Sequence, residues 1–180
     1  MGTEQPAEYY DAIYSKAKKY NRHYTGVRWL PMFEKAASLI ESDNILEIGC
    51  GVGQFANLLH DKGFRNYTGI DFSKEAIDRC KRLNLLGYHF IKGDAYKMSD
   101  VNNYDTIIAL ETLEHLNDFE ILSLIPKGKR VIISLPTFNN EAHLIWFNFE
   151  SEIFQRYDMI IDIDYIERIS DWFLFSGTKV

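Results

Sequence analysis

Apolar and polar residues follow one another along the chain with spacings that predict regular structure. Phe33, Ala37 and Ile40 recur at the three- and four-residue intervals of one helix face. Pro31 stands where a helix can begin, because the missing N–H of proline costs nothing in the first turn. The polar residues 42–44 end this predicted helix.

From residue 45 onward, short apolar runs alternate with amphipathic segments. The runs predict five strands, at 45–48, 67–70, 89–91, 104–110 and 130–135. The segments between them predict helices over 54–62, after Ser73 and over 115–125. Short strands separated by helices are typical of βαβ units, so we expect a parallel sheet covered by helices on both faces.

The two ends of the chain add further elements to this prediction. The tyrosine-rich residues 6–24 predict a helical arm, and helices resume over residues 141–156. Residues 159–163 and 172–177 predict the strands of a closing hairpin, with an irregular segment over 164–170. This hairpin would place one antiparallel strand at the edge of the sheet.

Composition limits the class of protein. With 180 residues, 46% hydrophobic residues and a net charge of −6, the chain fits one globular domain with a full core. No apolar run approaches the ~20 residues of a membrane span, and the N-terminus lacks the pattern of a signal peptide. Two cysteines, Cys50 and Cys80, cannot form a disulfide framework, so we expect a cytoplasmic protein.

Charge is spread unevenly along the sequence. Residues 1–40 carry a net charge of +2 and residues 141–180 a net charge of −5. An acidic chain of this kind is a poor candidate for binding a nucleic-acid backbone. The basic residues of the arm either form a solvated helix face or meet an anionic small substrate: Lys16, Lys18, Lys19, Arg22 and Arg28.

A glycine-rich turn carries the first candidate chemistry. Gly49, Gly51 and Gly53 lie between a predicted strand and a predicted helix, where the backbone can turn tightly and approach a ligand. Asp71 ends the next strand, where a carboxylate accepts hydrogen bonds from a ribose. Asp94 ends the third strand, where the amine of a purine would lie. Each aspartate could instead cap a helix or a turn.

The spacing of the glycines bears on the type of nucleotide. A dinucleotide site requires G-x-G-x-x-G, whereas here the spacing is G-x-G-x-G and position 54 is Gln54. Glu47 lies just before the turn, and a buried acid would repel a pyrophosphate. The same acid suits an ammonium group. A nucleoside joined to an amino acid is therefore favoured over a nicotinamide dinucleotide.

These segments together resemble a known family. Residues 45–54 (ILEIGCGVGQ), 67–73 (YTGIDFS), 90–95 (FIKGDA) and 104–111 (YDTIIALE) resemble the motifs of class I S-adenosylmethionine-dependent methyltransferases. The segments 129–136 and 173–179 resemble the last strands of that family. The resemblance covers about residues 30–180. It implies a Rossmann-like doubly wound seven-stranded sheet, mostly parallel with an antiparallel last strand, and residues 1–29 as an arm over the active site.

The resemblance also implies roles for single residues. Glu47 would orient the methionyl amino group, Asp71 would hold the ribose hydroxyls and Asp94 would bind the adenine amine. The other cofactor-binding residues implied are Gly49, Cys50, Gly51, Gln54, Phe72, Ala95, Tyr96, Leu110 and Glu111.

Within the family, the sequence motifs most resemble those of the ubiquinone-biosynthesis O-methyltransferases. It shares the pattern Asp105-x5-Glu111-x2-Glu114-His115. In that group, and in RNA-end 2′-O-methyltransferases, the two glutamates and the histidine are associated with a divalent metal. If the chain is helical there, Glu111, Glu114 and His115 share one face and could bind Mg²⁺, Mn²⁺ or Zn²⁺. The RNA enzymes have a further histidine downstream, for which His143 is the counterpart here.

The predicted reaction is methyl transfer to a small-molecule acceptor, with O-methylation favoured over N-methylation. An alcohol or phenol acceptor needs a base; His115 is the first choice and His143 the second, and Glu114 joins them as a candidate catalytic residue. Candidate walls of the acceptor pocket are aromatic: Tyr14, Tyr20, Tyr24, Trp29, Phe138, Trp146 and Phe147.

Other functions remain open on the sequence. A metal-dependent RNA-end methyltransferase fits the pattern at 105–115, although the acidic charge argues against it. A nicotinamide-dependent oxidoreductase on the same sheet and a cofactor-binding module without chemistry are further alternatives. We expect a monomer or a homodimer.

Overall fold

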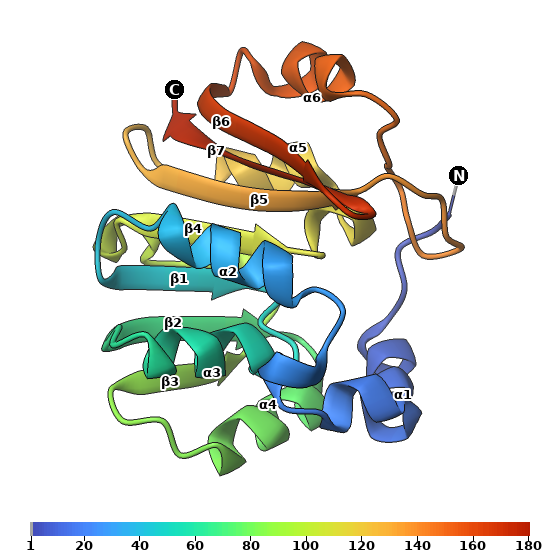
Figure 1. Cartoon of the computed structure of the whole chain (residues 1–180), viewed down its shortest axis with the longest axis vertical. Helices are drawn as coiled ribbons and strands as arrows, with labels where there is room; N and C mark the ends of the chain where they lie inside the picture. Colours follow the sequence, from blue (N-terminus) through green and yellow to red (C-terminus); the bar gives the residue numbers. More distant parts are fainter. Residues whose placement is uncertain (1) are drawn as a thin grey trace.

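The computed structural model describes residues 2–180, which form one α/β unit around a seven-stranded sheet (Figure 1). The strands are β1 (Asn44–Ile48), β2 (Asn66–Asp71), β3 (Tyr88–Lys92), β4 (Thr106–Leu110), β5 (Arg130–Pro136), β6 (Ile161–Ile169) and β7 (Trp172–Lys179). The α-helices are α1 (Ala7–Lys16), α2 (Leu30–Ser38), α3 (Gln54–Asp61), α4 (Lys74–Arg82), α5 (Asp118–Ser123) and α6 (Glu150–Tyr157). Short 3₁₀ turns span Lys18–Asn21, Tyr24–Gly26, Ala95–Lys97, Val101–Asn103 and Leu113–His115.

The order of the strands is β3-β2-β1-β4-β5-β7-β6. Strands β1 to β5 are parallel to one another, and β7 is antiparallel to both β5 and β6. The predicted sheet is confirmed, including its antiparallel last strand. That strand lies between β5 and β6, however, so the edge strand is β6. The carboxyl ends of β1, β2, β3 and β4 meet on one side of the sheet, where ligands bind in open α/β folds.

Alternate residues of each strand fill two separate cores. Ile108 and Ile132 pack on the side of α2 and α3, whereas Ile107 and Val131 pack on the side of α5 and α6. In Figure 1, α2 and α3 lie in front of the sheet and α5 lies behind it. The strands are therefore buried on both faces, which is why they read as continuous apolar runs.

Two predicted helices are shorter than the sequence suggests. The helix expected over 115–125 is α5, which begins only at Asp118 because the Asn117 side chain caps it, accepting a hydrogen bond from the Glu120 N–H. The helix expected from residue 141 is α6, which begins at Glu150. Residues 137–149 form a loop instead, because their backbone groups pair with other segments: the Leu144 N–H donates to the Glu114 carbonyl and the Phe147 N–H to the Pro136 carbonyl.

The segment predicted to be irregular over 164–170 is mostly strand. Strand β6 continues to Ile169 and pairs with β7 along its length, with a register shift between Ile163 and Tyr165. The Asp164 side chain accepts hydrogen bonds from Ser176 and Arg130. This local irregularity interrupts the two-residue alternation, so the sequence pattern does not indicate a strand there.

Within residues 2–180, none of the helices has both the length and the apolar character that crossing a lipid bilayer requires.

Candidate functional site

The glycine turn between β1 and α3 forms the floor of the site. Gly49, Gly51 and Gly53 have φ angles of +72°, +52° and +79°, a region that side chains other than glycine rarely adopt. A Cβ atom at Gly49 would also overlap the side chain of Thr112. The Thr112 hydroxyl lies 3.1 Å from the Ile48 carbonyl and 3.0 Å from that of Leu110, so it holds the ends of β1 and β4 together.

Asp71 fixes this turn to the end of β2. Its carboxylate accepts hydrogen bonds from the Gly51 N–H at 2.9 Å and from the Ser73 N–H at 2.8 Å. Burial raises the pKa of Asp71 to about 6, while the two backbone hydrogen bonds act in the opposite direction. The carboxylate is therefore ionised at neutral pH and remains an acceptor for further donors.

A first cavity, of about 620 Å³, opens beside Asp71. Asp94 lines the same cavity, so the two predicted carboxylates face one space. The Asp94 carboxylate also accepts from the Tyr96 N–H at 3.0 Å and pairs with Lys97, so its capping role is present as well. The other residues predicted for the adenine side also line this cavity: Phe72, Ala95 and Tyr96.

A second cavity, of about 1170 Å³, extends from the glycine turn toward the N-terminal arm and is lined by the predicted residues Glu47, Cys50, Gly51, Gln54 and Leu110. Burial raises the pKa of Glu47 to about 8, against the effect of the hydrogen bond that the Tyr67 hydroxyl donates to it. The Gln54 amide donates to the carbonyls of Lys19 and Arg22, which anchors the arm.

Lys19 and Arg28 bring positive charge to the second cavity. Burial, and after it the charge of Arg28, lower the pKa of Lys19. Facing them is Glu111, whose pKa burial raises to about 8, with Arg28 and Lys19 acting in the opposite direction. The two cations and Glu47 thus lie around one space, although they come from distant parts of the sequence.

The two cavities share five lining residues: Tyr10, Tyr14, Gly49, Glu111 and His115. We call this set the junction. Glu111 occupies an unusual backbone conformation for a side-chain residue, with φ +54°, which is typical of functional positions. Its Oε1 atom is buried and has no hydrogen-bond partner among residues 2–180. The sequence predicted a role for Gly49, Tyr14, Glu111 and His115 but not for Tyr10.

Glu114, His115 and His143 form a cluster next to the junction, with potential ligand atoms all within 4.8 Å of one another. Of the residues predicted to bind a metal, Glu114 and His115 belong to this cluster and Glu111 does not, whereas His143 joins it. The reason is local: the chain turns at Glu111 and forms a 3₁₀ turn over Leu113–His115, so the helical spacing assumed from the sequence does not occur.

The cluster has the chemistry of a metal site. Nδ1 of His115 lies 2.9 Å from the Ala142 carbonyl, and Nδ1 of His143 lies 3.1 Å from the Phe138 carbonyl. Because a carbonyl only accepts, each Nδ1 carries the proton and each Nε2 is left as the ligand atom. Both carboxylate oxygens of Glu114 are buried without a partner among residues 2–180. Two such imidazoles and an unsatisfied carboxylate fit a divalent metal.

Burial controls the protonation of this cluster. It lowers the pKa of His115 to about 4 and also lowers the pKa of His143, while it raises that of Glu114 well above its usual range. At neutral pH both imidazoles are uncharged and can accept a proton or bind a cation.

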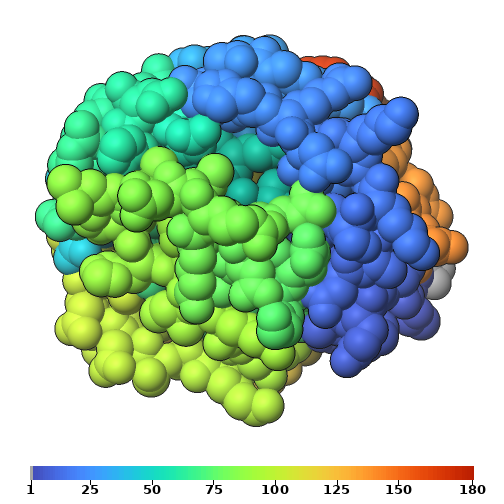
Figure 2. Space-filling view, turned by 90° about the horizontal axis from the view of Figure 1, so that it is seen from below, coloured from blue at the N-terminus to red at the C-terminus, as the bar shows by residue number. Residues whose placement is uncertain are grey.

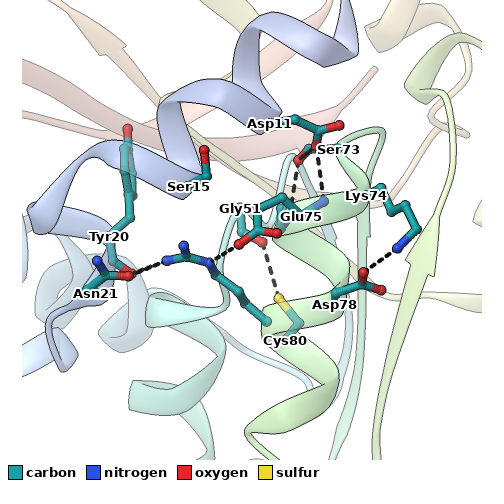
Figure 3. A network of polar contacts seen from close by, with 12 residues as sticks. Asp11, Ser15, Tyr20, Asn21, Gly51, Ser73, Lys74, Glu75, Asp78 and Cys80 are labelled. Carbon is teal, nitrogen blue, oxygen red and sulfur yellow. Dashed lines mark hydrogen bonds and ion pairs between the residues drawn. The ribbon is translucent and has the colours of Figure 1, made fainter.

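The N-terminal arm closes the site from the side of α4. The Asp11 carboxylate accepts hydrogen bonds from the Ser73 hydroxyl and, at 3.0 Å, from the Glu75 N–H (Figure 3). Further along the arm, the Gly2 N–H donates to the carbonyl of His143. Figure 2 shows the blue N-terminal segment packed against the green segment that contains α4. No side chain within Ala7–Lys16 is fully buried, so polar contacts and cavity-lining aromatic rings hold α1 in place.

Four of the seven predicted aromatic walls line the second cavity: Tyr14, Tyr20, Trp29 and Phe138. The prediction was wrong for the other three. Tyr24 donates a hydrogen bond to Asp61 at the surface, and Trp146 and Phe147 lie on a separate surface hollow beside α6. Trp146 and Phe147 lie outside the second cavity because residues 137–149 form a loop beyond the carboxyl end of β5 rather than a helix over the cavity.

Comparison with known proteins identifies the class. Residues 45–133, which contain β2 to β4 and most of β1 and β5, match the methyltransferase domain family. This span includes the glycine turn, Asp71, Asp94 and Glu111. The chain therefore contains a methyltransferase domain of the S-adenosylmethionine-dependent family, as the motifs predicted.

The relatives include O-methyltransferases and N-methyltransferases. The chain is 31% identical to the ubiquinone biosynthesis O-methyltransferase of Hydrogenovibrio crunogenus over 91 residues, which cover 48% of this chain and 37% of the relative. It is 26% identical to (S)-coclaurine N-methyltransferase of Papaver somniferum over 102 residues, covering 53% and 29%. The matches thus span about a third of the length of these relatives.

Solved structures share the fold over nearly the whole chain. Magnesium protoporphyrin IX methyltransferase from Synechocystis PCC 6803, solved with bound S-adenosylhomocysteine, superimposes with a TM-score of 0.72 at 16% identity. The match covers 97% of this chain and 100% of that structure. At this identity the match supports the fold, and the function has to be argued from the site.

Proposed function

We propose that this protein transfers the methyl group of S-adenosylmethionine to a small-molecule acceptor. One observation carries the proposal: two cavities at the carboxyl ends of β1 to β4 meet at a junction that presents unsatisfied polar atoms. A ligand that spans both cavities would have a nucleoside at one end and an amino acid at the other, with its reactive centre at the junction.

The charges of the site match such a ligand. Asp71 would accept from the ribose hydroxyls and Asp94 from the adenine amine in the first cavity. In the second cavity the methionyl ammonium group would lower the raised pKa of Glu47 and pair with its carboxylate, and Lys19 and Arg28 would attract the methionyl carboxylate. A diphosphate would instead meet the buried acid Glu47 close to the turn, which disfavours a nicotinamide dinucleotide.

The sulfonium of S-adenosylmethionine supplies an activated methyl group, so the residues of the chain mainly position the acceptor. When the acceptor oxygen attacks, the new O–C bond forms as the S–C bond breaks, and the sulfur keeps the electron pair. The proton of the hydroxyl passes to Nε2 of His115, which is uncharged and directed away from its carbonyl-bonded Nδ1. The aromatic walls of the second cavity exclude water and suit a ring-shaped acceptor.

A divalent metal is a second part of the proposal. Glu114, His115 and His143 would hold it, and two imidazole ligands favour Zn²⁺ over Mg²⁺. Bound there, the metal would occupy Nε2 of His115, so this imidazole would no longer serve as the base, and the metal would instead lower the pKa of an acceptor hydroxyl. Metal content measured after dialysis against each ion would test this, with His143→Ala as the variant expected to lose the metal and Asp105→Ala as a surface control.

Direct binding tests the main proposal. We expect isothermal titration to detect S-adenosylmethionine and S-adenosylhomocysteine binding at micromolar affinity, and no binding of NAD(H). A panel of phenols, carboxylic acids and amines should then reveal acceptors that release S-adenosylhomocysteine. Binding of NAD(H) in place of S-adenosylmethionine would overturn the proposal, and cofactor binding without turnover on any acceptor would favour a non-catalytic module.

A metal-dependent RNA-end 2′-O-methyltransferase is the second candidate. It is favoured by the position of His143, which joins Glu114 and His115 as the downstream histidine of that enzyme type would. The net charge of −6 disfavours it. Methylation of a short RNA that is abolished by a chelator and restored by Mn²⁺ would establish it. The cytoplasmic location and the monomeric or dimeric state remain predictions from the sequence.

A further inference from the structure

Tyr10 is a residue of the junction that the motifs did not reveal. It projects from α1 and lines both cavities. Its ring lies 5.3 Å from that of Phe72 on the nucleoside side and 5.7 Å from that of His115 on the acceptor side, measured between centroids. It therefore stands at the point where the two proposed ligands would meet.

The hydroxyl of Tyr10 is buried and lacks a hydrogen-bond partner among residues 2–180. Seven buried side-chain polar atoms in this part of the chain lack one, and four of them are the Tyr10 hydroxyl, Oε1 of Glu111 and the two oxygens of Glu114. Buried polar groups are normally satisfied, so a concentration of exceptions at one place points to a missing ligand.

The environment of this hydroxyl keeps it a donor. Burial raises the pKa of Tyr10, and the nearby carboxylate of Glu114 raises it further. Tyr10 is therefore protonated at any physiological pH.

We propose that the Tyr10 hydroxyl donates a hydrogen bond to the acceptor atom and thereby selects oxygen over nitrogen. This inference rests on the proposed methyltransferase function and names the acceptor class of that same site. Tyr10 is a specificity residue that touches the substrate, and the arm delivers it only when α1 is docked.

The selection follows from the number of lone pairs. A hydroxyl oxygen has two, so it can accept from Tyr10 with one and attack the methyl carbon with the other. A neutral amine has a single lone pair, which a hydrogen bond from Tyr10 would occupy, and an ammonium group has none. An oxygen acceptor is therefore held in place by the hydrogen bond and keeps a lone pair for the attack. A nitrogen acceptor has no lone pair left with which to attack the methyl carbon.

Binding of small aromatic probes to the protein saturated with S-adenosylhomocysteine tests this directly. Phenol, aniline and toluene differ in the group presented, and ligand-observed NMR measures their dissociation constants. For the wild type we expect phenol to bind several-fold tighter than toluene. Tyr10→Phe keeps the ring contacts and should abolish this preference, a change of up to about tenfold. Tyr24→Phe, which removes a surface hydroxyl, is the matched control and should leave it intact.

The outcomes separate the two proposals. Failure of S-adenosylhomocysteine to bind the wild type would overturn the proposed function itself. Binding of S-adenosylhomocysteine with no preference for phenol, or a preference that survives in Tyr10→Phe, would overturn the role of Tyr10 and leave the function standing. With an acceptor identified, Tyr10→Phe should lower kcat about tenfold for a hydroxyl substrate. An equal loss on an amine substrate would contradict the selection.

Discussion

The two cavities of this protein are built in different ways. The first is framed mainly by strand ends and the turns that follow them, so most of its residues are fixed by the sheet and by backbone hydrogen bonds such as those of Asp71, although the arm adds Glu4, Gln5, Tyr10 and Tyr14. The second takes much of its lining from the arm and the loop over 137–149, which are far apart in sequence. Chemistry common to a family is expected in the rigid part, and specificity in the part that varies.

The largest effect that would test this contrast is on Asp71. We expect Asp71→Ala to weaken S-adenosylmethionine binding by about a hundredfold, because it removes two charge-assisted hydrogen bonds to the ribose and frees the Gly51 N–H. Isothermal titration measures the loss. Asp94→Ala, on the same cavity, should cost only about tenfold, since Asp94 is half exposed. Equal losses would contradict the ranking.

Substitutions in the second cavity should affect binding of S-adenosylmethionine but not binding of adenosine. We expect Lys19→Ala combined with Arg28→Ala to weaken S-adenosylmethionine about tenfold and to leave adenosine binding unchanged, because these cations face only the second cavity. Lys16→Ala, on the arm but outside both cavities, is the control. A parallel loss for adenosine would show that the cavities are not separate in function.

Lowering the pH should weaken cofactor binding in the first cavity. The pKa of Asp71 is raised to about 6, so its carboxylate takes up a proton as the pH falls through that value and can no longer accept two ribose hydrogen bonds. The part of the affinity for S-adenosylmethionine that Asp71 contributes is expected to be intact above pH 7 and to fall by up to about tenfold per pH unit below 6. Asp71→Asn should bind weakly and should lack this fall below pH 6.

The smallest effect is expected at the hydrogen bonds that Asp11 of α1 accepts at the start of α4. Asp11→Asn keeps the size of the side chain but weakens its bonds to Ser73 and to the Glu75 N–H. We expect faster hydrogen exchange over residues 7–16 and a three- to tenfold loss of cofactor affinity. Lys74→Ala, which breaks an exposed pair with Asp78 on the same helix, should change neither.

Sequence reasoning succeeded where local pattern determines structure. The glycine turn, Asp71 and Asp94 could be placed because the ends of adjacent parallel strands necessarily meet. It failed at Glu111, where a left-handed backbone turn takes the place of the assumed helix and separates this residue from the cluster of Glu114, His115 and His143. Helical spacing is informative only where the backbone is helical.

Contacts between distant segments were the other source of error. Tyr10 was missed because its place at the junction depends on how α1 docks against α4. Trp146 and Phe147 were placed in the acceptor pocket because residues 141–156 read as one helix, whereas a loop carries them to a separate surface hollow. Nothing in the local pattern indicates the partners of that loop, such as the Glu114 carbonyl.

The short chain of bonds from Asp71 to Ser73 and on to Asp11 has a kinetic consequence. Ser73 gives its N–H to the carboxylate that would hold the ribose and its hydroxyl to the one that holds the arm. Cofactor occupancy and arm position are therefore thermodynamically linked through one side chain. We expect a compulsory order of addition, with the nucleoside entering before the acceptor and leaving after the methylated product, and product inhibition patterns would display that order.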